Sequence, residues 1–157
     1  MAPLFHLPSP RAGAEPARWC QLSGSISSLA IADAARTDTR PWLVIENGAQ
    51  ALEQRQAELR FYGGPDLPLW QLPDWEMLPY DSFAPHPDLI SERLRTLAAL
   101  PHLTRGVVLV SIDTLPMRLP PRQYIESRSF QLRPGQQLAL EPFRQRLVAS
   151  GYVAVGR

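Results

Sequence analysis

The stretch "GVVLVSI", residues Gly106–Ile112, decides the fold of this chain. It is rich in β-branched residues and nearly all apolar, a pattern typical of a central parallel strand that is buried on both faces. Parallel neighbours must be joined by crossover connections, which usually contain a helix. The stretch therefore predicts an α/β fold, in which helices alternate with the strands of a parallel sheet.

Two weaker strand signals precede this stretch. "WLVIE" (Trp42–Glu46) is a short apolar run that we expect to form a strand buried on both faces. "LPLWQL" (Leu67–Leu72) is a second, weaker strand candidate. Segments of helical character alternate with these runs, and this order favours right-handed crossovers in a parallel sheet flanked by helices.

Three helices are predicted from apolar spacing, caps and stop signals. The candidate N-caps are Ser25, Asn47 and Asp88, and the candidate stops are Gly63, Gly64 and Pro101. The residues expected to face the sheet are Ile26, Leu29, Ala30 and Ala34 in the first helix, Leu52 and Leu59 in the second, and Ile90, Leu94 and Leu97 in the third.

A proline-dense stretch, "TLPMRLPPRQY", marks a domain boundary. We expect residues 1–21 to be a loosely ordered lead-in, residues 22–120 to be a first α/β domain, and residues 121–157 to be the first part of a small α/β domain. For the small domain we predict the strands "SFQLR" and "YVAVG", and between them a helix with Pro142 at its first position. About 30 residues are too few to fold alone, so this small domain is expected to be incomplete.

The composition excludes several classes of chemistry. All 16 basic residues are arginines, so the chain has no lysine for a Schiff base, a general base or a phosphate-binding loop. Cys20 is the only cysteine, which excludes an internal disulfide and fits a reducing cytoplasm. We expect no secretory signal and no membrane span. The net charge of +1 gives no overall field that would attract nucleic acid.

The segment at Gly24 has two interpretations. It precedes a helix, as a phosphate-binding loop does, and Ser27 and Ser28 stand where such a loop has its lysine and threonine. However, the segment has one glycine and no lysine. The alternative is an ordinary helix start with serine caps, and the residues favour this second interpretation.

The segment "LPDWEMLPYDSFAPHPD" (Leu72–Asp88), here called the joint, is dense in proline, acidic and aromatic residues. The acidic residues could be catalysts or metal ligands, but turns and helix caps are favoured because no histidine or cysteine stands at metal-ligand spacing. The aromatic residues could stack on bases, but the acidic surroundings favour anchoring of a loop across the end of the sheet. The acidic residues are Asp74, Glu76, Asp81 and Asp88, and the aromatic residues are Trp75, Tyr80 and Phe83.

Four arginines that follow the joint could form a polar patch: Arg93, Arg95, Arg105 and Arg118. Arg93 and Arg95 are two positions apart and do not share a helix face, so a solvated face is favoured for them. From the residues alone we predict no catalytic residue and no metal site. The chain indicates an α/β domain without visible catalysis.

Three motifs at fixed spacing resemble a known family. "DWE-x-LPYD-x-F-x-P" begins at Asp74, "ISERL-x-TL" at Ile90 and "GVVLVSIDTL" at Gly106. Together they resemble the N-terminal module of the bacterial transcription-repair coupling factors, and the resemblance extends more weakly from about Leu22 to the end. It implies a helicase-like α/β domain similar to the front of the excision-repair helicase UvrB, followed by a small domain that binds UvrA.

The resemblance also implies that the family's ATP-driven activity and most of its partner-binding sites lie outside this segment. The nucleotide site of this module is degenerate in the family, which agrees with Gly24, Ser27 and Ser28 standing without a lysine. The family's motor, which uses ATP and Mg²⁺, and its RNA-polymerase-binding domain lie in other parts of a longer protein that acts on duplex DNA. The family's UvrA-contacting residues are expected beyond Arg157. No cofactor is therefore expected in this segment, and no membrane partner.

We accordingly expect a non-catalytic scaffold and recruitment module. Its parent protein would translocate on DNA, displace stalled RNA polymerase and recruit the nucleotide excision repair machinery. Two alternatives remain open, namely a fragment of a nucleotide-dependent repair helicase and an arginine-based nucleic-acid-binding module. The absent lysine counts against the first alternative, and the near-zero net charge counts against the second.

Overall fold

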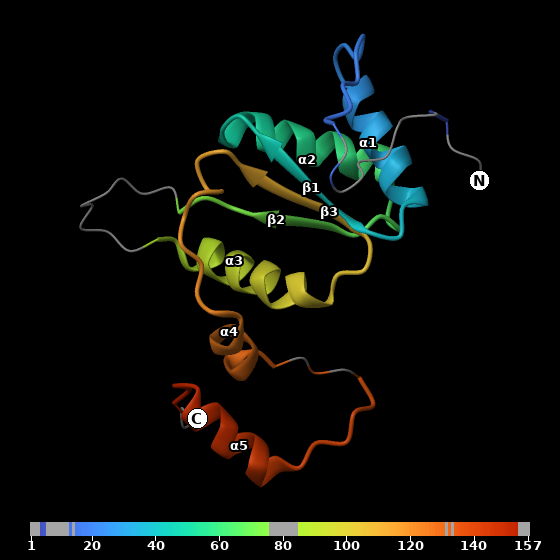
Figure 1. Ribbon diagram of the computed structural model, residues 1–157. Helices are drawn as coiled ribbons and strands as arrows, with labels where there is room; N and C mark the ends of the chain where they lie inside the picture. Colours follow the sequence, from blue (N-terminus) through green and yellow to red (C-terminus); the bar gives the residue numbers. More distant parts are fainter. Residues whose placement is uncertain are drawn as a thin grey trace. The chain divides into compact units, whose positions relative to one another are not determined.

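The computed structural model describes residues 4–5, 13, 15–75, 85–130, 132 and 134–153 (Figure 1). The chain divides into two compact units, residues 1–119 and residues 120–157. Within the described residues, the first unit holds a parallel sheet with its helices, and the second unit holds two helices. Each unit is described by itself.

The sheet of the first unit has the strand order β1-β3-β2 among the described residues. β1 (Pro41–Glu46) and β2 (Leu69–Leu72) both pair in parallel with β3 (Gly106–Ser111). All six residues of β3 are buried. The predicted α/β fold and the central parallel position of this strand are therefore confirmed.

Helices cover the two faces of the sheet unequally. α1 (Ile26–Thr37) and α2 (Ala49–Gly63) pack against each other and cover one face (Figure 1). α3 (Pro87–Ala99) packs against β2 and continues into the short 3₁₀ helix η1 (Leu100–His102). Parallel sheets normally have both faces covered by helices, and this sheet is fully covered on one face only.

The main hydrophobic core lies between the sheet and the α1–α2 pair. Val107 and Leu109 of β3 are both fully buried there, and Leu52 and Leu59 of α2 pack in the same cluster. The predicted inner face of α2 is thus confirmed. Its predicted end is confirmed as well, because the helix stops at Gly63 and Gly64 follows with a positive φ of 66°.

β1 differs from its expected burial. Its residues alternate between exposed and half-buried, and Leu43 and Ile45 are 56% and 46% exposed. The expectation of a strand buried on both faces is therefore wrong. The reason is tertiary, because β1 lies at the edge of the three strands and α3 packs against β2, on the other side of β3.

The starts of the first two helices agree only in part with the prediction. Ser25 is the N-cap of α1, as predicted, but its side chain forms no capping hydrogen bond. The N-cap of α2 is Gly48, with a φ of 92°, rather than Asn47. In α1, Ile26 is exposed and Leu29 only half-buried. The buried residues of α1 are mostly small and permit a close approach to α2; they are Ser28, Ala30, Ala32, Asp33 and Ala35.

α3 is also rotated relative to its predicted apolar stripe. Its buried residues are Arg93, Thr96 and Ala99, whereas Leu94 is 46% exposed and Leu97 half-buried. The buried face of α3 includes a residue that satisfies a backbone carbonyl of β2, because Thr96 Oγ1 donates a hydrogen bond to the carbonyl of Gln71 at 2.5 Å. The apolar spacing alone therefore gave the wrong face.

Asp88 is not the N-cap of α3. That position is His86, whose Nδ1 accepts a hydrogen bond from the backbone N–H of Asp88 at 3.3 Å. The side chain of Asp88 is 92% exposed in the first turn. Its carboxylate still lies at the positive end of the helix, where acidic residues are favoured.

In the second unit the described elements are α4 (Arg122–Arg128) and α5 (Leu140–Ala149). α4 was not predicted, because prolines precede it and it has only seven residues. α5 begins at Leu140, so Pro142 is its third residue rather than its first. The described residues of the two predicted strands, Ser129, Phe130, Leu132, Tyr152 and Val153, are not in strands, and the others lie outside the described residues.

Because the two faces of the sheet are covered unequally, truncating an apolar side chain should destabilise the fold more on the covered face than on the open face. Leu109→Ala should lower the free energy of unfolding by about 2–5 kcal/mol, because Leu109 is fully buried and leaves a cavity. Leu43→Ala should cost less than about 1 kcal/mol, because Leu43 is largely exposed. Urea denaturation followed by circular dichroism measures both. Equal losses would mean that the face around Leu43 is closed in solution.

Candidate functional site

The residues of the predicted degenerate loop come together at the start of α1. Gly24 has a φ of 58°, which favours glycine, and the carbonyl of Gly24 accepts a hydrogen bond from Ser27 Oγ at 3.4 Å. Ser28 is fully buried. The N-terminus of a helix offers free backbone N–H groups to an anion, so the surroundings of these two serines decide what this loop can bind.

A guanidinium from α2 occupies the space beside the two serines. Arg55 Nη1 donates hydrogen bonds to Ser27 Oγ and Ser28 Oγ, both at 2.6 Å. Arg55 Nε donates to Glu46 Oε1 at 2.6 Å, which ties α2 to the end of β1. Glu58 accepts a hydrogen bond from Ser28 Oγ. We call these five residues, Ser27, Ser28, Glu46, Arg55 and Glu58, the loop network.

The loop network has two carboxylates, Glu46 and Glu58, against the single guanidinium of Arg55. Glu58 Oε2 lies 3.9 Å from Arg55 Nη1. Hydrogen bonds from Ser28 and Gln54, together with the charge of Arg55, hold the pKa of Glu58 below its ordinary value. An incoming phosphate would therefore meet two carboxylates and an arginine that already has partners. The geometry ties α1, α2 and β1 together, and it offers an anion little free positive charge.

Sequence reasoning found the serines but missed the charged residues of the loop network. The spacing of Arg55 and Glu58 on one helix face indicates an ion pair, which was a usable signal. Nothing local connects that pair to Ser27 and Ser28, which are 27 or more positions away. Only the packing of α1 on α2 brings them together.

The described end of the joint is held by Arg93. Its Nη1 donates a hydrogen bond to the carbonyl of Pro73, and its guanidinium carbon lies 4.3 Å from the ring centroid of Trp75, which is half-buried. Arg93 is only 2% exposed, so its predicted place on a solvated face is wrong. Burial lowers the pKa of Arg93, and the charge of Asp74 opposes this shift.

The remaining motif residues of the joint are not brought into a described site. Glu76, Tyr80, Asp81 and Phe83 lie outside the described residues. Asp74 Oδ1 accepts a hydrogen bond from the backbone N–H of Trp75 at 2.7 Å, which is the turn role expected of it. Across the described part of the chain, no three His, Cys, Asp or Glu side chains are grouped so that they could hold a metal ion.

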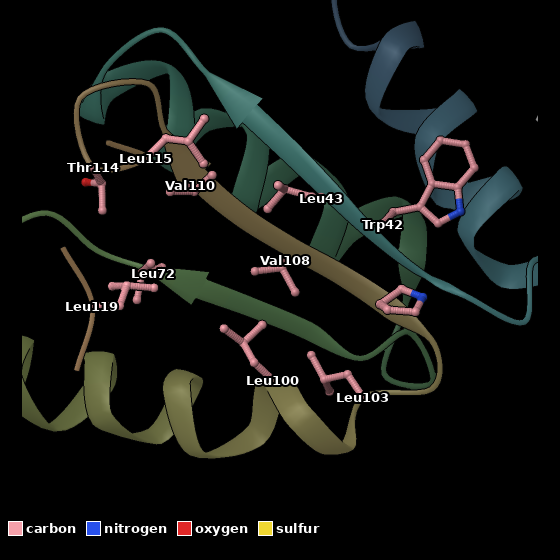
Figure 2. Close-up of a pocket in the computed structure, with 11 residues that line it drawn as sticks. Trp42, Leu43, Leu72, Leu100, Leu103, Val108, Val110, Thr114, Leu115 and Leu119 are labelled. Carbon is pink, nitrogen blue, oxygen red and sulfur yellow. The ribbon is translucent and has the colours of Figure 1, made fainter. Parts of the chain in front are cut away.

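An apolar groove opens on the less covered face of the sheet (Figure 2). It has a volume of about 310 Å³, and Thr114 is its one polar side chain among eleven lining residues. Figure 2 shows side chains from β1, β3, β2 and η1 turned toward it, including Leu43, Val108, Val110, Leu72 and Leu100. The groove offers apolar contact and almost no hydrogen bonding, so it suits packing against another apolar surface better than chemistry.

Comparison with curated proteins gives a consistent result. The chain is 34% identical over 132 residues to the transcription-repair-coupling factor of Escherichia coli, which is 84% of this chain and 11% of that protein. It is 43% identical over 83 residues to the factor of Haemophilus influenzae, or 53% of this chain and 7% of that protein. The factor of Staphylococcus haemolyticus is 27% identical over 131 residues. This chain is similar to a segment of the transcription-repair-coupling factors.

The resemblance expected from the three sequence motifs is therefore confirmed. The chain spans about one tenth of the length of the coupling factors that it matches most extensively. No protein-family profile matches the chain. Within the described residues, no helix is long and apolar enough to cross a membrane.

The two arginines on α3 should contribute unequally to stability. Arg93→Ala should lower the free energy of unfolding by about 2–4 kcal/mol, because it leaves the carbonyl of Pro73 without its partner and removes the guanidinium from the Trp75 ring. Arg95→Ala is the matched control, with a guanidinium 5.3 Å from the Trp70 ring, and should cost less than about 1 kcal/mol. Denaturant melts of both variants test this. A larger loss of stability in Arg95→Ala than in Arg93→Ala would refute the structural role given to Arg93.

The loop network predicts a pH dependence of stability. The folded-state pKa of Glu58 is lowered, so its contribution is fully present above the ordinary value of 4.5 and is lost as pH falls through the folded-state pKa. Glu58→Gln should therefore be less stable than the parent chain at pH 7, and the difference should disappear in strong acid. Urea midpoints across this range measure it. Glu53→Gln, an exposed change on the same helix, controls for the loss of one carboxylate.

Proposed function

We propose that this chain acts as a non-catalytic scaffold and recruitment segment of a transcription-repair coupling factor. The observation that carries the proposal is the match to the Escherichia coli factor over 84% of the chain. The name of that relative joins transcription to repair. In this proposal the segment takes part in the recruitment of repair proteins, as part of a longer protein that acts in the cytoplasm.

The loop network supports the non-catalytic part of the proposal. A nucleotide loop requires free backbone N–H groups and an unpaired cation for the phosphates. Here Arg55 is bound to Glu46 and to both serines, and the chain has no lysine. These contacts count against the alternative of a nucleotide-dependent helicase fragment. We assign ATP and Mg²⁺ to other parts of the parent protein.

The partners follow from the same proposal. The parent protein would bind RNA polymerase and duplex DNA through its other regions and would recruit the excision machinery through UvrA. We assign the UvrA contact to the small domain that starts in residues 121–157, with contacting residues beyond Arg157. The apolar groove on the sheet of the first unit is consistent with a segment that works by packing against other protein surfaces.

A nucleotide titration tests the non-catalytic assignment. Isothermal calorimetry of the chain with Mg-ATP should give no binding heat, because the loop network has no free cation for the phosphates. Arg55→Met removes the guanidinium and should not create binding, because no lysine takes its place. A micromolar dissociation constant for the parent chain that is lost in Ser27→Ala would contradict the proposal.

Capture of purified UvrA on the immobilised chain tests the recruitment assignment separately. We expect weak or no capture by the 157 residues, and salt-resistant capture by a chain extended through the whole small domain. Equal capture by both would place the contact within these 157 residues. Capture by neither would refute recruitment of UvrA while leaving the nucleotide result unaffected.

A further inference from the structure

The charge of the chain is divided unevenly between its two units. Residues 1–119 contain ten arginines against thirteen acidic residues, a net charge of −3, whereas residues 120–157 contain six arginines against two acidic residues, a net charge of +4. The overall charge of +1 therefore conceals a basic second unit. A concentrated basic surface is the usual electrostatic footprint of a protein that binds nucleic acid.

Both acidic residues of the second unit are paired with arginines on their own helices. Arg122 Nε lies 2.6 Å from Glu126 Oε1 on α4, and Arg144 Nη1 lies 3.3 Å from Glu141 Oε1 on α5. Within the described residues of this unit, no side-chain carboxylate is left for the other arginines. The excess positive charge of the described helices therefore resides on Arg128 and Arg146.

Those two arginines line the same cavity. It has a volume of about 220 Å³ and is formed by the ends of α4 and α5, with Ser127 and Arg128 from one helix and Arg146, Ala149 and Ser150 at the end of the other. No carboxylate lines it, and neither arginine forms an ion pair within the described part of the chain. Two guanidinium groups in one concave site are suited to bind an oxyanion.

The arginines could instead serve only to offset the negative ends of their helices. The hydrogen bonds argue against this for α5. The carbonyl of Arg146 accepts from the backbone N–H and the hydroxyl of Ser150, and the carbonyl of Leu147 accepts from the backbone N–H of Tyr152. The last turn is thus capped without the guanidinium of Arg146, whose N–H donors stay available for a ligand.

Aromatic rings hold both guanidinium groups in place. The guanidinium carbon of Arg128 lies 4.0 Å from the ring centroid of Tyr124, and that of Arg146 lies 5.0 Å from the ring centroid of Phe130. Such stacking orients a guanidinium and leaves the N–H groups at its edge accessible to a ligand. Arg128 Nη1 also donates a long hydrogen bond, 3.4 Å, to the hydroxyl of Ser127. Tyr124 and Tyr152 are 51% and 59% exposed, and Tyr152 lies against Phe130, so both residues offer aromatic surface near the two arginines.

We propose that the cavity between Arg128 and Arg146 binds a backbone phosphate of a single-stranded nucleic acid, with Tyr124 and Tyr152 available to stack on its bases. Single strands combine a phosphate with unpaired bases, which matches arginines interleaved with exposed aromatic rings. A duplex presents phosphates but keeps its bases stacked. This activity goes beyond the proposed recruitment of a protein partner and does not depend on it.

Fluorescence anisotropy with a labelled oligothymidylate of about 12 nucleotides tests the proposal on the whole chain. The double variant Arg128→Gln/Arg146→Gln should bind at least about tenfold more weakly than the parent chain, because two charge-assisted contacts are lost. The slope of log K against log salt should become shallower by about 1.4, or about 0.7 for each phosphate contact on a single strand. Circular dichroism checks that the helices remain.

The matched control is Arg122→Gln/Arg144→Gln, which removes the same charge from the same two helices but from arginines already paired with glutamates. It should change the affinity less than about twofold. An equal loss in the control would overturn the proposal, since binding would then depend on net charge and not on this cavity. No binding by the parent chain would also overturn it.

Competition identifies the source of the anion. Unlabelled oligothymidylate should displace the probe, whereas inorganic phosphate and a duplex of equal length should compete poorly, because neither presents unpaired bases for stacking. Polyglutamate of the same charge that displaced the probe as well as oligothymidylate would overturn the proposal in favour of an acidic protein segment. Arg128→Lys/Arg146→Lys keeps the charge but loses the planar, stacked guanidinium, so it should recover only part of the affinity.

Discussion

The fold depends on the burial of one strand. β3 is paired on both sides with parallel strands and has no exposed residue, so its alternate side chains must be covered on two faces at once. α1 and α2 meet this requirement for Val107 and Leu109. On the other face, α3 covers the β2 side and leaves Leu43 exposed. The apolar groove is the direct consequence of this incomplete covering.

The loop network ties three elements of the first unit together. Arg55 joins the start of α1 to the end of β1 and to Glu58 on its own helix. The contacts that hold the helix pair in place use the donors and the charge that a phosphate would need. The helix start that resembles a nucleotide loop in position therefore serves the packing of the fold.

The two units present different surfaces. The first has a negative net charge and an apolar groove that suits contact with protein. The second has a positive net charge, with arginines stacked on aromatic rings around a cavity without carboxylates. Because the opposite charges nearly cancel, a count over the whole chain hides a property that belongs to each unit separately.

The sequence by itself determined the α/β fold, the central strand at Gly106–Ser111, the inner face and end of α2, and the resemblance to the coupling factors. These depend on local signals, namely β-branched apolar runs, glycine stops and motif spacing. Tertiary structure alone decided that Leu43 is exposed, that Arg93 is buried and that Arg55 meets the serines of α1. In each case the outcome depends on which element lies across from the residue, and a local pattern carries no information about a neighbour distant in the sequence.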